Sequence, residues 1–291
     1  MNSRKRNVIL SAQRLFIKKG FLSTSIQDIL DEAGISKGTF YNYFSSKNEC
    51  LLAILENVKE EVFLRRQELL VGKDQTDKRV LSHQIAVRFI LNRENNMLPI
   101  YEAIYYAKDE DLRMFIKKHH FYELSWLSER IREVYGPAVD KHAVDCAIML
   151  FGMIQHYLQA WRLISNEEIR LEELIEYVMR RIDAIVKDVI SSDDLFINEF
   201  LSISEYRVEE DLSELRNEVE KKLGNLMEVD DQDVRKYVEF LLEEFDRKEP
   251  RFILIESIME SLRNYQKQFP ENEQIREVVF FVSRLSNALK S

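Results

Sequence analysis

Glycine and proline are scarce in this chain of 291 residues, which contains only seven glycines and four prolines. A protein rich in strands needs frequent turn residues, so this scarcity excludes most strand-rich architectures. Hydrophobic residues make up 45% of the chain and charged residues 32%, a balance typical of soluble, folded proteins. The composition therefore predicts an all-α fold of long helices joined by short links, with enough length for two or three compact units.

Long apolar runs and cysteines are also scarce. No uninterrupted apolar run approaches the ~18 residues of a membrane span, and the run from Val8 to Leu10 is too short for a secretory signal. The two cysteines, Cys50 and Cys146, lie in helical patterns without metal-ligand spacing. We therefore expect buried, reduced thiols and a cytoplasmic protein.

Catalytic motifs are missing as well. The chain has no glycine-rich phosphate loop, no nucleophile elbow and no His-Glu zinc motif. His119 and His120 are adjacent, so on a helix their side chains diverge and cannot hold one metal ion together. We expect a protein that is not an enzyme and that carries no metal or cofactor.

Charge is distributed unevenly along the chain, whose net charge is −9. Residues 1–50 contain eight basic and four acidic residues and carry +4, so the remaining 241 residues carry −13. A basic end on an acidic body concentrates the attraction for phosphate at that end. The distribution favours a nucleic-acid contact made by the N-terminal segment.

Three short helices are predicted in this segment, over residues 3–19, 24–33 and 37–44. Gly20 and Gly34 are the expected left-handed stops of the first two helices. Thr24 and Gln27 match a capping box at the start of the second helix, and Ser36 is the expected cap of the third.

The third helix separates two kinds of side chain. At 100° per residue, one side gathers the aromatic rings of Phe40, Tyr43 and Phe44. The opposite side presents Gly38 and Asn42, flanked by Lys37, Thr39 and Tyr41. Two helices joined by a tight turn containing glycine, the second short and polar outside, form the helix-turn-helix pattern.

The stretch from Thr24 to Phe44, followed by Ser46, Lys47 and Leu51, resembles the signature of the TetR family of transcriptional regulators. The resemblance implies that the third helix enters the major groove and that the fourth links this head to a helical dimer body that binds a small molecule. It implies a set of DNA contacts: Thr24, Ser25, Ser36, Lys37, Gly38, Thr39, Tyr41, Asn42 and Lys47.

Chemistry supports several of these implied roles. Lys37 and Lys47 can neutralise phosphates, while Thr39 and Asn42 can read base edges, with asparagine preferring adenine. Members of the family often have histidine at the position of Asn42, so the preferred base there stays open. Thr24 and Ser36 are equally well explained as helix caps alone.

Further helices are predicted in the body, near residues 78–94, 98–107, 110–135, 140–165 and 169–191. Apolar stripes within Ala143–Ile164 and Leu174–Val189 exceed what one small bundle needs to bury. In the family resembled, the last two body helices pair with those of a second copy, so we expect a homodimer.

Aromatic and methionine side chains of the body are candidates for an effector pocket. They are Tyr101, Tyr105, Phe115, Trp126, Met149, Met153, His156 and Trp161. Each of them also fits an ordinary core, and His156 fits a hydrogen-bonded core histidine.

The last hundred residues match no pattern of the family. Helices are predicted there over residues 195–223, 231–247, 251–268 and 272–289, with Gly224 in a break. This acidic, amphipathic tail is either a second bundle that enlarges the dimer or braces the body, or a docking surface for a protein partner.

We therefore predict a DNA-binding domain at 1–48 (helix-turn-helix about 25–44), a dimerisation and effector domain at 49–191 and an extra helical domain at 192–291.

These features together predict a homodimeric repressor that binds a palindromic operator in double-stranded DNA and is released by a small lipophilic or amphipathic effector. The alternative is a DNA-binding protein that is regulated by, or recruits, a protein partner through its tail, without a small-molecule ligand.

Overall fold

The computed structural model describes residues 3–106, 109–165, 167–197, 212–227, 229, 231–269 and 272–290. Every regular element within these ranges is a helix, which confirms the all-α prediction. None of the helices described is both long and apolar enough to span a bilayer. By packing, the chain divides into two compact units, Met1–Val62 with Asp74–Tyr206, and Phe63–Lys73 with Arg207–Ser291.

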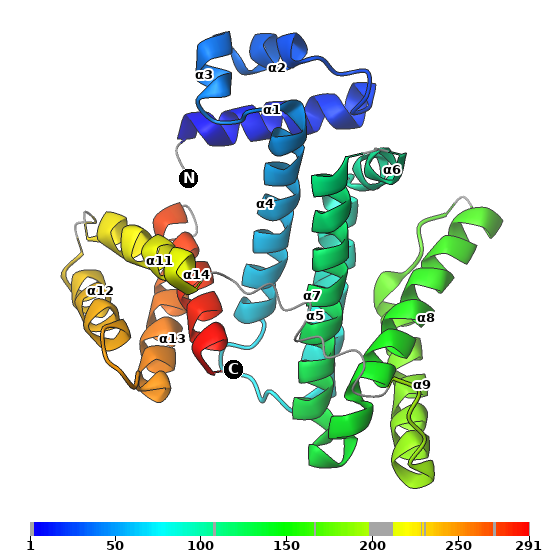
Figure 1. Ribbon diagram of the computed structural model, residues 1–291. Coiled ribbons are helices and arrows are strands. Elements are labelled where there is room, and N and C mark those ends of the chain that lie inside the picture. Colours follow the sequence, from blue (N-terminus) through cyan, green and yellow to red (C-terminus); the bar gives the residue numbers. More distant parts are fainter. Residues whose placement is uncertain are drawn as a thin grey trace. The chain divides into compact units, whose positions relative to one another are not determined.

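The head consists of three helices and the first turns of a fourth (Figure 1): α1 (Ser3–Lys19), α2 (Ile26–Ala33), α3 (Lys37–Tyr41) and α4 (Lys47–Glu68). Figure 1 shows α1 lying crosswise beneath α2 and α3, with α4 starting beside α1. Their apolar sides share one core, in which Phe16, Ile29, Phe40 and Ile54 are almost completely buried. The core fixes how α3 is presented at the surface of the head.

Glycines end the first two helices, as predicted. Gly20 (φ +83°) follows α1, and Gly34 (φ +65°) follows α2 and donates its N–H to the carbonyl of Leu30. Backbone in this left-handed region favours glycine because it has no Cβ. The chain therefore turns sharply at both points and can bring three short helices together within the head.

The body belongs to the same unit as the head and contains α5 (Lys78–Glu94), α6 (Leu98–Tyr106), α7 (Glu110–Tyr135), the 3₁₀ helix η1 (Pro137–His142), α8 (Ala143–Ile164) and α9 (Leu171–Ser192). Residues Met97, Ile100, Ile104 and Leu112 extend the head core into α6 and the start of α7. A second core lies between α5, α7, α8 and α9. Gly136 (φ +80°) ends α7 directly before Pro137.

The apolar stripe of α9 is less available for a dimer than the sequence indicated. Leu174, Ile175, Val178, Ile182 and Val186 are all buried in the core of their own unit. The prediction that this stripe exceeds the needs of one bundle was therefore wrong for these residues. The exposed apolar side chains of α8 and α9 are different ones: Ile148, Tyr157, Leu163, Ile164, Tyr177 and Ile190.

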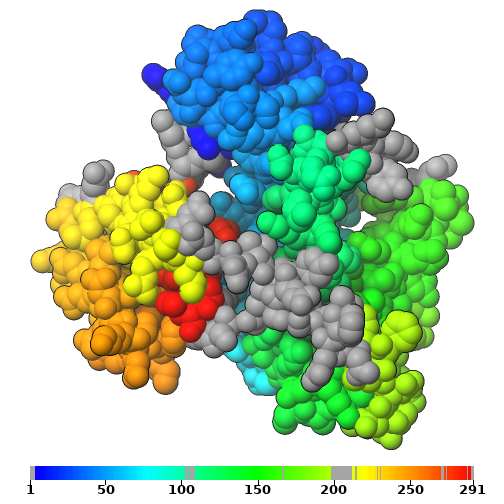
Figure 2. Space-filling view, viewed as in Figure 1, coloured from blue at the N-terminus to red at the C-terminus, as the bar shows by residue number. Residues whose placement is uncertain are grey.

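The tail unit contains α11 (Leu212–Leu226), α12 (Gln232–Phe245), α13 (Phe252–Gln268) and α14 (Glu273–Lys290), shown in yellow to red in Figure 2. Its core also takes in Phe63 and Leu64 from the last turns of α4. The ring of Phe63 meets that of Phe280 edge to face, with centroids 5.2 Å apart. The tail is thus built around the end of the same helix that begins in the head.

An ion pair between buried Glu244 and half-exposed Arg251 links the end of α12 to the N-cap of α13. The carboxylate of Glu244, at the end of α12, is buried and accepts hydrogen bonds from the Arg251 guanidinium at 2.6 and 2.9 Å and from the Arg251 backbone N–H at 2.7 Å. Arg247 lies 3.2 Å from the same carboxylate. These bonds fix the turn between α12 and α13, and they hold the pKa of Glu244 down at about 2.

Two sequence predictions for the tail differ from the structure. A helix was predicted over residues 195–223, but Leu195, Phe196 and Ile197 are not helical, and residues 198–211 lie outside the described ranges. Gly224 was predicted to lie in a break, but it lies inside α11. By contrast, both cysteines are free and buried as expected, and burial raises the pKa of Cys50 to about 12 and that of Cys146 to about 11.

Candidate nucleic-acid interface

The first turn of α3 is fixed by Ser36. This residue has extended backbone (φ −77°, ψ 158°), and its Oγ accepts a hydrogen bond from the backbone N–H of Thr39 at 3.2 Å. The two hydroxyl groups of Ser36 and Thr39 also lie 2.9 Å apart and share a hydrogen bond. Ser36 is therefore the N-cap of α3, as predicted, and its hydroxyl is engaged within the head.

The inner side of α3 is aromatic. Phe40 is 0% exposed and Phe44 1%, and their ring centroids are 5.6 Å apart. Tyr43 is half-buried and packs against the same core. The helix itself is shorter than predicted: it ends at Tyr41, and a turn in which Tyr43 and Phe44 both donate their N–H groups to the Phe40 carbonyl completes the segment.

The outer side of α3 is polar and open to solvent. Lys37, Gly38, Tyr41 and Asn42 are exposed, with 46% of the Tyr41 surface accessible. Within the described part of the chain, the side chains of Lys37, Tyr41 and Asn42 make no hydrogen bond or ion pair, although the Tyr41 ring touches that of Phe40. A cation, a phenol and an amide are thus left available to an outside partner.

Gly38 has no structural need to be glycine. A Cβ built on it would meet only the Ser36 Oγ, at 3.9 Å, which is ordinary van der Waals contact. Its φ does not lie in the left-handed region either. The missing side chain therefore opens the outer face of α3 to the close approach of another molecule.

The start of α2 differs from the prediction by one residue. The capping box is formed by Ser25 and Asp28: the Ser25 Oγ accepts the Asp28 N–H at 3.1 Å, and the Asp28 carboxylate accepts the Ser25 N–H at 2.8 Å. Thr24 is 1% exposed, and its hydroxyl donates to the Gly20 carbonyl at 2.8 Å. Ser25 remains exposed where a DNA backbone could lie, whereas Thr24 is turned into the protein, contrary to its predicted contact.

Comparison with known protein families gives a match to this N-terminal head. The family model described as "Bacterial regulatory proteins, tetR family" matches residues 8–54, from α1 into α4. The head of this chain is thus similar to the TetR family. The match covers α1 from Val8 onward and all of α2 and α3, so the resemblance inferred from the sequence is confirmed.

Proteins similar to this chain carry regulator names. The uncharacterized HTH-type transcriptional regulator YerO of Bacillus subtilis is 30% identical over 194 residues, 63% of this chain and 64% of YerO. The uncharacterized regulator YuxN of the same organism is 26% identical over 185 residues, 63% of each chain. The HTH-type transcriptional repressor KstR2 of Mycobacterium tuberculosis is 31% identical over 70 residues, 24% of this chain and 35% of KstR2.

The fraction of each chain covered by the match also indicates how long the relatives are. This chain spans less than two thirds of each of these relatives. Because the match takes nearly equal shares of both partners, YerO and YuxN are about as long as this chain, whereas KstR2 is shorter.

Lys47, in the first turn of α4, is half-buried, and its ammonium is engaged within the head. Its ammonium donates hydrogen bonds to the backbone carbonyls of Phe21 at 2.8 Å and Thr24 at 2.7 Å, and it lies 4.4 Å from the centroid of the Phe21 ring. Burial lowers the pKa of this ammonium. In the free protein the ammonium of Lys47 is therefore bound to the head, and its phosphate contact stays a prediction.

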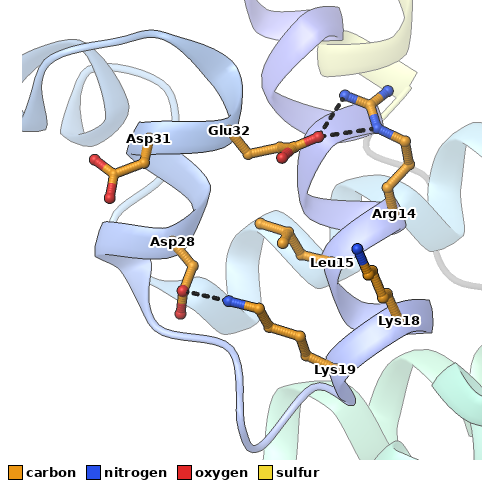
Figure 3. Close-up of a pocket in the computed structure, with 7 residues that line it drawn as sticks. All are labelled: Arg14, Leu15, Lys18, Lys19, Asp28, Asp31 and Glu32. Atoms are coloured by element: carbon orange, nitrogen blue, oxygen red, sulfur yellow. Dashed lines mark hydrogen bonds and ion pairs between the residues drawn. The ribbon is translucent and has the colours of Figure 1, made fainter.

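A polar groove of about 500 Å³ separates α1 from α2 in the head (Figure 3). Two ion pairs cross it, Arg14 with Glu32 at 3.3 Å and Lys19 with Asp28 at 2.6 Å. The hydrogen bond from Lys19, followed by those from Ser25, holds the pKa of the Asp28 carboxyl well below its usual range. Three cations of α1 (Arg14, Lys18 and Lys19) face three carboxylates of α2 (Asp28, Asp31 and Glu32), so the lining of the groove carries no net charge.

A small cavity lies in the body, lined by residues of α4, α5, α6 and α7: Leu55, Val58, Lys59, Val62, Arg88, Asn92, Tyr101, Phe115 and His119. Its volume of about 10 Å³ is enough for one water molecule. The Tyr101 hydroxyl donates to the Asn92 side-chain oxygen at 3.2 Å, and Arg88 lies 3.3 Å from the buried carboxylate of Glu123. The cavity is thus lined by three apolar side chains and Lys59 on its α4 side and by Arg88 and Asn92 on its α5 side.

Few of the predicted effector residues line this cavity. Only Tyr101 and Phe115 do; Trp126, Met149 and Met153 are half-buried against the body core. His156 is exposed on α8, so neither its predicted pocket role nor a core role fits. The Trp161 indole donates to the Glu167 carbonyl at 2.8 Å, and the side chain of Tyr105 lies outside what the structure describes.

The sequence reasoning missed the polar lining of the cavity. Arg88, Asn92 and His119 gave no signal because each lies singly in an amphipathic helix, where a polar residue is usually solvated. Among the residues that the structure describes, no group of three or more His, Cys, Asp or Glu side chains could hold a metal ion.

Proposed function

We propose that this protein is a DNA-binding transcriptional regulator whose head places α3 in the major groove of double-stranded DNA. The observation that carries the proposal is the division of α3 into a buried aromatic side and an exposed polar side, formed by Lys37, Gly38, Tyr41 and Asn42. Exposed side chains that bind nothing within the protein are available to bind a partner. The TetR-family match over residues 8–54 supports the same assignment.

Each exposed group of α3 suits one element of a duplex. The Lys37 ammonium attracts phosphate, and the Tyr41 hydroxyl can donate to a phosphate oxygen. The Asn42 amide can donate to N7 and accept from the amino group of adenine. Because the Thr39 hydroxyl is shared with Ser36, its methyl group is the part that can meet a thymine methyl.

A homodimer is the second part of the proposal. Exposed apolar side chains gather on α8 and α9, a composition that suits burial against a second copy, and they include Ile148, Tyr157, Leu163, Ile164, Tyr177 and Ile190. Leu163 is 82% exposed and Ile164 78%, and the two are adjacent at the end of α8. Two heads related by a two-fold axis would read a palindrome whose half-sites lie about 34–36 Å apart.

Release by a small lipophilic or amphipathic effector is the third part. The body cavity holds only about one water molecule, so an effector must open it. Leu55, Val58 and Val62 of α4 line the cavity, and Leu55 and Val58 also belong to the head core. An effector that binds the opened cavity would therefore favour a different position of α4, and so of the head. Repression is the proposed sign, since KstR2 carries the name of a repressor.

The alternative function, control by a protein partner on the tail, rests on one observation. Phe63 and Leu64 at the end of α4 belong to the tail core, while Leu51 and Ile54 near its start belong to the head core. A partner that binds the tail can thus act on a helix that reaches the head. Residues 192–291 contain 24 acidic and 14 basic residues, and this net charge of −10 disfavours a DNA contact by the tail itself.

Selection of bound duplexes from a random pool by the full-length protein tests the proposal. We expect a palindromic sequence, because two symmetry-related heads read both strands alike. A Tyr41→Ala, Asn42→Ala double variant, which keeps the core rings, should select no sequence. Failure of the native protein to retain any duplex at low salt would refute the proposed function.

A titration then separates the two control mechanisms. Thermal-shift screening with small lipophilic molecules, followed by DNA release with any molecule that stabilises the protein, supports the effector. A variant truncated after residue 191 that binds DNA but no longer responds to a cell extract supports the protein partner.

A further inference from the structure

The segment between α1 and α2 contains a group of backbone carbonyls that no helix satisfies. After α1 ends at Lys19, the chain passes through Gly20, whose carbonyl accepts the Thr24 hydroxyl at 2.8 Å. The Phe21 carbonyl accepts the Thr24 N–H at 3.3 Å. Phe21 and Thr24 are themselves buried, 4% and 1% exposed. Buried carbonyls in such a loop need donors from elsewhere in the protein.

Lys47 supplies those donors from the first turn of α4. Two of its three N–H groups are taken by the Phe21 and Thr24 carbonyls, at 2.8 and 2.7 Å, and the charge lies over the Phe21 ring. The Phe21 ring is held in turn by Phe16 of α1, with centroids 5.0 Å apart. Hydrogen bonds from an ammonium are stronger than neutral ones, especially where water is partly excluded.

We infer that Lys47 is a positioning residue, which holds the start of α2 against α4 and so sets the DNA-binding face of the head, and that it does not bind a DNA phosphate. This inference rests on the proposed function, since it concerns how the head binds a duplex. The next residue after Thr24 is Ser25, the N-cap of α2, so a shift of the Thr24 carbonyl moves the cap directly.

The contrast with Lys37 supports this assignment. Lys37 is exposed on the outer side of α3, and its ammonium has no hydrogen-bond or ion-pair partner in the described part of the chain. To turn toward a phosphate, Lys47 would have to give up two charged hydrogen bonds, and the buried Phe21 carbonyl would keep only the Thr24 N–H at 3.3 Å. Such a loss opposes any gain from the phosphate.

Two variants that remove the same charge separate the roles. Lys47→Met keeps the aliphatic stem but loses the donors, and Lys37→Met is the matched control at an exposed position. Hydrogen exchange of the full-length protein without DNA is the first readout, over the peptide of residues 21–29. We expect exchange there to rise by about tenfold or more in Lys47→Met, because two charged hydrogen bonds are lost, and to be unchanged in Lys37→Met.

Binding to a duplex selected from the random pool, measured from 50 to 200 mM salt, is the second readout. A lost phosphate contact reduces the slope of log K against log salt by about 0.9. We expect Lys37→Met to reduce the slope by about 0.9 for each head, because each head then loses one phosphate contact. Lys47→Met should instead bind at least about tenfold more weakly with an unchanged slope, at a temperature where the variant is fully folded.

The outcomes decide between the two roles. Unchanged exchange in Lys47→Met overturns the inference, whatever the DNA result. A slope reduced by about 0.9 overturns it as well, since that is the signature of a phosphate contact. Unchanged affinity with raised exchange would make Lys47 a structural residue without influence on DNA, which also overturns it. If native protein binds no duplex, the proposed function fails, and the exchange readout alone decides whether Lys47 holds the start of α2.

Discussion

Replacing Gly38 by alanine should change stability and DNA binding in opposite directions. Gly38 lies in the first turn of α3, exposed and with an ordinary helical backbone. A methyl group there meets only the Ser36 Oγ at 3.9 Å, so the free protein accommodates it without strain. Alanine is favoured over glycine in a helix by about 0.5–1 kcal/mol.

The gain in stability is small but measurable. For a unit of this size, 1 kcal/mol corresponds to about 2–4 °C in Tm, so Gly38→Ala should raise Tm by roughly 1–4 °C. In the complex with DNA, the added methyl group would occupy space that α3 and the duplex need in order to approach each other closely. Inserting a methyl into a well-packed interface costs about 1–3 kcal/mol, which is about 5- to 150-fold in affinity for each head.

The assay combines thermal unfolding with fluorescence anisotropy of a selected duplex. Gly224→Ala is the matched control: this glycine is also helical and exposed, with no atom within 4 Å of the added Cβ, but it lies in the tail. We expect Gly224→Ala to leave DNA affinity unchanged. Equal affinity of Gly38→Ala and native protein would refute the placement of α3 against DNA, and a lowered Tm would refute the packing argument.

Three further predictions concern other parts of the chain. Asn42→Ala should leave Tm unchanged, because this exposed amide has no partner in the described structure. The variant should lose about 1–3 kcal/mol of discrimination at one base pair per half-site, and an equal loss of affinity for every DNA sequence would contradict base reading. A double-mutant cycle of Phe63→Ala and Phe280→Ala in urea unfolding should give a coupling of about 0.5–1.5 kcal/mol from their edge-to-face contact; additive effects would place the end of α4 outside the tail core. The pKa of Glu244 falls from 4.5 in the unfolded chain to about 2 in the folded protein, so its stabilising effect is present above pH 4.5 and is lost as the pH falls toward 2. Glu244→Gln should therefore make the unfolding of the tail less sensitive to acid. An unaltered pH profile of unfolding would contradict this assignment.

The head could be predicted closely because its signals are local. Gly20 and Gly34 end helices through backbone geometry, and Ser36 caps the next helix through a side chain three residues from its partner. The shift of the capping box from Thr24 to Ser25 shows the limit of such signals. Both residues carry the hydroxyl that the pattern requires, and only the fold reveals that the Thr24 hydroxyl is drawn back to the Gly20 carbonyl.

The predictions that depended on tertiary packing were less successful. The stripe of α9 at Ile175, Val178 and Ile182 is apolar whether it faces its own core or a second copy, so the sequence could not separate the two. His156 and Trp161 lie on α8 among apolar residues, but the rotation of α8 turns His156 toward solvent.

Lys47 illustrates the same point within the candidate site. A lysine at the start of a helix in a basic head is typical of a phosphate ligand, and only the position of the Phe21 and Thr24 carbonyls reveals its other partners. The role of Phe63 was equally hidden, because an apolar residue late in α4 fits the body as well as the tail.

Photochemical cross-linking tests the central proposition most directly. The intact protein would be bound to its selected duplex carrying bromodeoxyuridine in place of thymidine, irradiated, and digested for mass spectrometry. We predict cross-links within residues 37–42, with Tyr41 as the main site. The Tyr41→Ala, Asn42→Ala variant, which we expect not to bind the duplex, should give none. Cross-links confined to the body or the tail, from a complex that forms with native affinity, would contradict the assignment of α3 as the helix that reads DNA.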